Sequence, residues 1–181
     1  MGEFEKHFLA LTFWIRLLLT SMKYDLPNSQ EIYNRLIEET NHFEKLMYEL
    51  GQSNPEMFKS YMVDFIVTFR NLAIAEMSDN SQLKNKSFEN ILQITNKISE
   101  YFYNLNPQSD LDKWHHLFHD YVQMLYSEIN FIFNDDYKGD LDLFDKLINQ
   151  SYLLADYIAN ALFSRMASKP NEKRSNNIFI C

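Results

Sequence analysis

Apolar residues recur along this chain at intervals of three and four, the period of an amphipathic helix. Breaks in the pattern fall at residues 26–28, 51–55, 78–81, 106–110 and 134–139, and they leave six segments of roughly 20–28 residues. The pattern therefore predicts six long helices. The stripe is clearest at Phe4, Phe8, Leu11, Ile15, Leu18 and Met22, at Phe88, Ile91, Thr95, Ile98, Phe102 and Leu105, and at Trp114, Phe118, Tyr121, Leu125, Glu128 and Ile132.

The segment ends carry helix-boundary signals. Asn28 or Ser29 can cap the second helix, and Asn54 followed by Pro55 opens the third. Because the connections are short, successive helices should run antiparallel. We expect an all-α, up-down antiparallel bundle of about six long helices over residues 1–167, packed like ferritin-like and other four-helix bundles, and a loose tail at 168–181. The first helix is apolar almost all round, so we expect it at the centre.

Composition supports a helical protein and excludes two classes of partner. Apolar residues make up 46% of the 181 residues, whereas Gly 3 and Pro 4 are too few for a turn-rich β architecture. The one cysteine, Cys181, cannot form an intramolecular disulfide, which suits a cytoplasmic protein. A net charge of −8 repels phosphate groups, so neither nucleic acid nor an anionic membrane is an expected partner.

Residues 8–22 form an apolar run that could be mistaken for a targeting or membrane segment. Arg16 interrupts this run, and Glu3 and Glu5 precede it where a signal peptide carries positive charge. The run is also too short to span a bilayer. We interpret it as a buried helix.

Three charged residues fall among apolar ones. Arg16 lies within the most apolar helix, Glu128 falls on the apolar stripe of the fifth helix, and Asp156 interrupts an apolar run at 152–158. A buried charge without a partner is costly, so these groups should pair with one another or line a water-filled pocket. An internal salt bridge that fixes helix register is the simplest explanation. The alternatives are a polar pocket for a small ligand, and one or more of the three being exposed.

Histidines provide two weak metal-binding patterns. His115 and His119 are four residues apart, share one helix face and could bind one divalent ion, but a solvated histidine-rich face is the favoured explanation. Di-metal bundles use a Glu-x-x-His motif on each of two helices, and only one such motif occurs, from Glu39 to His42. Because we interpret the face that carries Glu39 and His42 as polar, this single match indicates coincidence. We therefore predict no cofactor, with a divalent metal as the alternative.

The chain shows no recognisable catalytic motif. Its serines lack a Gly-x-Ser-x-Gly elbow, its cysteine is the last residue, and three glycines cannot form a phosphate-binding loop. No set of residues supplies an acid, a base and a charge stabiliser. Catalysis is therefore the least favoured class of function.

Several short pieces of sequence carry a family resemblance. In chain order they are Trp14-x-Arg16, Leu26-Pro27 with Asn34-Arg35-Leu36, Leu105-Asn106-Pro107, Trp114, Glu128 and Ala155-Asp156. With these pieces the chain resembles a family of small, uncharacterised helical-bundle proteins of Gram-positive spore-formers, some of them mislabelled acetylglutamate kinase. The resemblance implies a histidine on the first, third and fifth helices, where this chain has Leu11, Phe65 and Tyr121. It therefore implies that a central polar cluster has been replaced by packing.

From these observations we expect a non-catalytic helical bundle that acts by binding, either to itself as a homodimer or to another protein. The alternative is a metal- or small-ligand-binding bundle with a polar core at Arg16, Glu128 and Asp156.

Overall fold

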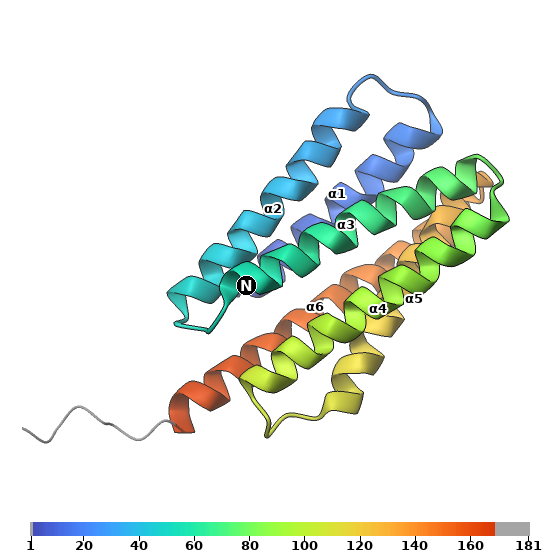
Figure 1. The fold of residues 1–181 in the computed structure, drawn as a ribbon. Helices are drawn as coiled ribbons and strands as arrows, with labels where there is room; N and C mark the ends of the chain where they lie inside the picture. The colour runs from blue at the N-terminus through green and yellow to red at the C-terminus, as the bar shows by residue number, and fades with distance from the viewer. Residues whose placement is uncertain (1, 169–181) are drawn as a thin grey trace, which may run out of the picture.

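The computed structural model describes residues 2–168, and this part of the chain forms six α-helices and no strand (Figure 1). The predicted all-α bundle is therefore confirmed. Ser168 ends the last helix, and the rest of the predicted tail at 168–181 lies outside the described residues. The helices are α1 (Glu3–Lys23), α2 (Ser29–Glu49), α3 (Pro55–Met77), α4 (Ser81–Leu105), α5 (Leu111–Phe133) and α6 (Tyr137–Ser168).

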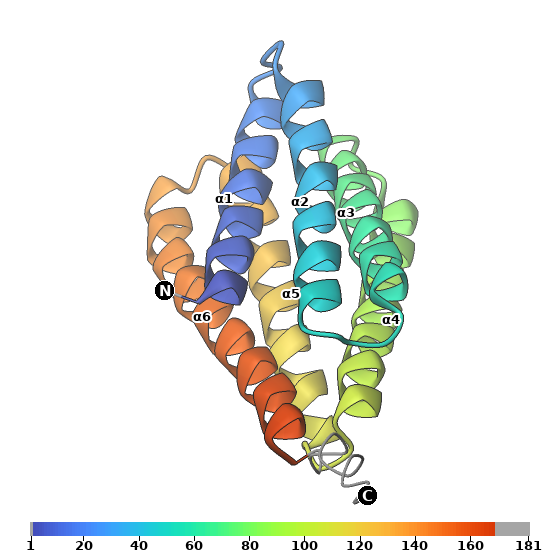
Figure 2. The ribbon, with the colours of Figure 1, turned by 90° about the vertical axis from the view of Figure 1, so that its left-hand side faces the viewer.

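The helices close into a ring. Each one packs on the next in the chain, and α6 returns to lie beside α1 (Figure 2). Helix α5 also contacts α1 and α3, so it lies nearest to the middle of the bundle, whereas α2 packs mainly on α1 and α3. The ring closure brings the two ends of the chain's helical part, α1 and α6, against each other and against α5.

Helix α1 is not central, contrary to the expectation from its apolar sequence. Its buried stripe faces the bundle, but Phe13 and Leu17 are each 47% exposed on its outer side. Apolar composition alone overestimated its burial because an apolar residue can lie on either side of a helix. No helix in residues 2–168 combines the length and hydropathy needed to cross a membrane.

Aromatic side chains fill the core where α3, α4 and α5 meet. The ring of Phe102 stacks on those of Trp114 and Phe118, with centroids 5.1 and 6.2 Å away, and Phe58 meets it edge-on at 5.0 Å. The indole N–H of Trp114 donates to Ser109 Oγ at 2.9 Å, so burial leaves this polar group paired. The predicted stripe on α5 is thus the inner face of the bundle.

Four helices end in the same hydrogen-bonded turn, which explains how so few glycines suffice. The residue after the helix cap adopts a left-handed conformation, with φ of 49° at Asp25, 62° at Gly51, 50° at Asp79 and 57° at Asp135. The next amide then donates back across the turn, as Leu26 does to the Ser21 carbonyl at 2.9 Å. Aspartate tolerates this conformation better than most side chains, although less well than glycine.

Asp25→Gly should therefore stabilise the protein by about 0.5 kcal/mol, because glycine relieves the left-handed strain at the end of α1. Asp25→Ala should instead destabilise it by about 1 kcal/mol. Urea unfolding of the three proteins measures both changes. Equal midpoints for the glycine and alanine variants would show that the φ of residue 25 does not limit stability.

Candidate functional site

Arg16 lies at the centre of a charged cluster that joins α1, α5 and α6. Its guanidinium donates from Nη1 to Glu128 Oε1 at 2.9 Å, and from Nη1 and Nη2 to the two carboxylate oxygens of Asp140. Glu128 is fully buried, and Asp140 is nearly so. Arg16 and Glu128 therefore pair as the sequence predicts, with Asp140 as a further partner.

Glu128 is the carboxylate of this cluster whose charge is least well compensated. Its Oε2 is buried without a hydrogen-bond partner among the described residues. Burial raises its pKa to about 7, the bond and charge of Arg16 oppose this rise, and the charge of Asp140 adds to it. One guanidinium thus pairs with two carboxylates, and it donates two hydrogen bonds to Asp140 but only one to Glu128.

Asp156 does not belong to the cluster. It lies exposed on α6, and the expectation that it joins Arg16 and Glu128 in a polar core is wrong. Asp140 occupies that role from the first turn of α6. An acidic residue in a first helical turn is ordinarily explained by the helix dipole, so the sequence offered no reason to single Asp140 out.

A chain of hydroxyl groups continues the polar core across the same three helices. Tyr121 OH and Thr12 Oγ1 are 2.7 Å apart, Thr12 Oγ1 and Ser151 Oγ are 2.8 Å apart, and Ser151 donates to the Leu147 carbonyl at 2.8 Å. Burial raises the pKa of Tyr121, so its hydroxyl stays protonated. Each of the three buried hydroxyls therefore has a hydrogen-bond partner within the bundle.

Leu11, Phe65 and Tyr121, the positions where the family resemblance implies histidines, all line one small cavity. Its volume is about 10 Å³, and its other walls are apolar. Such a space is too small and too apolar to hold a water molecule. The bundle is therefore closely packed around these three positions.

His115 and His119 stack on α5 with ring centroids 6.2 Å apart. His119 Nε2 is 2.9 Å from Asn96 Oδ1, and burial followed by the charge of His115 lowers the pKa of His119. No third histidine, cysteine or acidic side chain in residues 2–168 lies close enough to complete a metal site with this pair. The pair therefore lacks the ligand set that a metal needs.

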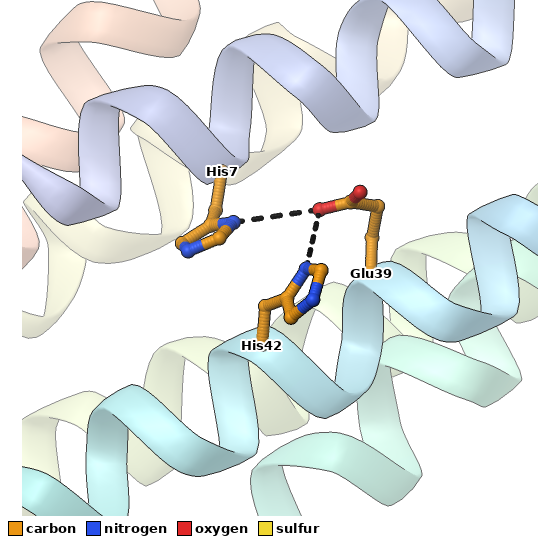
Figure 3. A group of neighbouring side chains, drawn as sticks. All are labelled: His7, Glu39 and His42. Atoms are coloured by element: carbon orange, nitrogen blue, oxygen red, sulfur yellow. Dashed lines mark hydrogen bonds and ion pairs between the residues drawn. The ribbon is translucent and has the colours of Figure 1, made fainter.

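The structure assembles a different set of metal-ligand side chains between α1 and α2. His7 of α1 and His42 of α2 both direct Nδ1 at Glu39 Oε2, at 3.4 and 3.1 Å (Figure 3). The three ligand atoms all lie within 4.8 Å of one another. Glu39 is only 3% exposed because it lies on the buried stripe of α2.

Neighbouring groups fix the orientation of these ligands. Arg35, one helical turn before Glu39, approaches the other carboxylate oxygen, Oε1, at 3.3 Å. His7 packs edge-on against Phe43, with ring centroids 5.7 Å apart. Burial lowers the pKa of His7, and the bond and charge of Glu39 offset only part of this effect. The ring is therefore neutral at neutral pH, the state in which imidazole binds a metal.

The His7, Glu39 and His42 side chains form part of the wall of a groove of about 500 Å³ between α1 and α2. Its basic side chains are Lys6, Arg35 and Lys45, its acidic ones are Glu3, Glu39 and Glu49, and its apolar ones are Ala10, Trp14 and Leu46. His42, at 41% exposure of its side chain, is the most accessible of the three candidate ligands. A metal here would thus face the groove.

Part of this site was visible in the sequence. Glu39-x-x-His42 is the single Glu-x-x-His motif of the chain, and the interpretation that it lies on a polar face is wrong. Glu39 in fact falls between Leu36 and Phe43 on the apolar stripe. A carboxylate on that stripe was the missed signal, whereas the third ligand, His7, comes from another helix.

No family model, curated protein or solved structure matches this chain.

Asp140→Asn should destabilise the protein by about 2 kcal/mol, because it breaks the bidentate pair with Arg16 and leaves a partly buried charge. Asp156→Asn should change stability by less than about 0.5 kcal/mol, since Asp156 is exposed on the same helix. Chemical denaturation compares the two. Equal losses would show that Asp140 contributes no more than an ordinary surface charge.

Glu128 should make stability depend on pH. Its pKa is raised from 4.5 to about 7 on folding, so its contribution is fully present below pH 4.5 and is lost as pH rises through about 7. Relative to Glu128→Gln, the wild type should lose up to about 3 kcal/mol across this window. Urea midpoints of both proteins at about pH 5 and about pH 8 test this. A constant difference between them would contradict it.

Proposed function

We propose that this protein binds a divalent transition-metal ion through His7, Glu39 and His42. The observation that carries the proposal is the convergence of two imidazoles and one buried carboxylate from two helices. Metal–ligand bonds of about 2.1 Å give a tetrahedron with edges of about 3.4 Å. The nitrogen–oxygen separations of 3.4 and 3.1 Å are close to that edge.

The donor set favours particular metals. Two imidazole nitrogens with one carboxylate oxygen suit Zn²⁺ and its neighbours Co²⁺, Ni²⁺ and Cu²⁺. Mg²⁺ and Ca²⁺ prefer sites made of oxygen ligands, so they fit poorly. Three protein ligands also leave at least one coordination position open, as in catalytic rather than structural zinc sites.

Arg35 supports this use of Glu39. It contacts Oε1, so Oε2 is left to the two histidines and to a metal between them. Ligating carboxylates are commonly held in this way by a second shell of hydrogen bonds. Arg35 also contacts Glu38 at 3.0 Å, and that carboxylate offsets its positive charge near the ion.

The experiment is a zinc titration of untagged protein by calorimetry at neutral pH. We expect one equivalent to bind, and His7→Ala or His42→Ala to weaken binding by at least about 100-fold, because each removes a ligand. The matched control is His115→Ala with His119→Ala, which removes two histidines outside the site and should leave the affinity unchanged.

Without a metal, Glu39 would simply be a buried carboxylate held by two imidazoles and a guanidinium. That explanation predicts the same zinc affinity for the wild type and His7→Ala, and this result would overturn the proposal. Native mass spectrometry of the same samples reports bound mass and oligomeric state together. Homodimerisation, a cytoplasmic location and membership of the spore-former family stay predictions.

A further inference from the structure

The groove beside His7, Glu39 and His42 is larger than a metal ion needs. Its volume of about 500 Å³ is within the range of small-molecule sites. Because three protein ligands do not fill a tetrahedral coordination shell, the remaining position belongs to water or to a ligand atom. His42 is the most exposed of the three ligands, so that position is reached from the groove.

The charges of the groove define what can enter. Three basic and three acidic side chains line it, so the formal charges of its lysine, arginine and glutamate side chains cancel. Lys6 is paired with Glu3 at 3.6 Å and Lys45 with Glu49 at 3.7 Å. A divalent ion therefore brings an excess charge of +2 into an otherwise balanced groove of an acidic protein. This favours a small anion over a neutral molecule, and Glu3 and Glu49 disfavour a polyanion.

Apolar residues also line the groove. They are Ala10 and Trp14 of α1 and Leu46 of α2, and the guanidinium of Arg35 lies 5.8 Å from the centre of the Trp14 ring. An aromatic ring of this kind offers a flat surface to an apolar or aromatic body. The groove thus combines the candidate metal ligands with an apolar surface at Trp14.

We propose that the metal-loaded groove binds a small organic monocarboxylate, whose carboxylate oxygen takes the open coordination position and whose apolar body packs on Trp14. This inference rests on the proposed metal site. It assigns the ligand class by chemistry: one negative charge, one oxygen donor and an apolar portion the size of an aromatic ring.

The test uses protein loaded with Co²⁺, whose visible absorption reports its coordination. We expect benzoate to change the spectrum saturably, to bind about tenfold more tightly than acetate, and benzyl alcohol to have no effect. Trp14→Leu should bind Co²⁺ normally and abolish the preference for benzoate over acetate. Lys45→Gln should weaken benzoate binding, whereas Lys59→Gln, a lysine paired with Glu44 outside the groove, should not.

Three results would overturn the inference. If Co²⁺ binds but benzoate at millimolar concentration leaves its spectrum unchanged, the carboxylate proposal fails and the metal site stands. If the protein without metal binds benzoate equally well by calorimetry, coordination is not involved. If Co²⁺ does not bind at all, the metal proposal and the carboxylate proposal fail together.

Discussion

The closure of the helical ring depends on one guanidinium. Arg16 on α1 reaches Glu128 on α5 and Asp140 on α6, residues that are 112 and 124 positions away in the chain. Apolar side chains at such an interface would tolerate small sliding of one helix along another. Hydrogen bonds with fixed direction do not, and the hydroxyl chain from Tyr121 through Thr12 to Ser151 repeats the constraint on the same helices. Together they fix the register of α1.

That register has a consequence on the far side of α1. His7 and Arg16 are nine residues apart, which is about 13 Å along a helix and about two and a half turns. The two side chains therefore leave α1 in nearly opposite directions, Arg16 toward α5 and α6 and His7 toward α2. The charged cluster thus holds the helix that presents His7 to Glu39 and His42. Arg16 therefore supports the proposed metal site indirectly, because it fixes the position of the helix that carries His7.

The sequence predicted those features that a single helix defines. The three-and-four spacing identified the helices, and charges among apolar residues identified Arg16 and Glu128, because both signals are local. Asp156 was misplaced because the run around it is apolar on both sides of α6, where Leu153 is 56% exposed. Asp140 and His7 were missed for a different reason. Asp140 acquires its role from α1, 124 residues away, and the sequence pattern does not say that these helices face each other. His7 acquires its role from the next helix, α2, but the pattern does not fix the register in which the two helices pack.

The peripheral position of α2 bears on how long a bound ion would stay. This helix packs mainly on α1 and α3, whereas α5 contacts four other helices. Elements with fewer neighbours open locally at a lower free energy than the global unfolding of the protein, so their amide hydrogens exchange sooner. Two of the three candidate ligands are on α2 and the third is on α1. Each local opening of α2 would therefore separate Glu39 and His42 from His7. The rate at which α2 opens would then limit how long the ion stays bound.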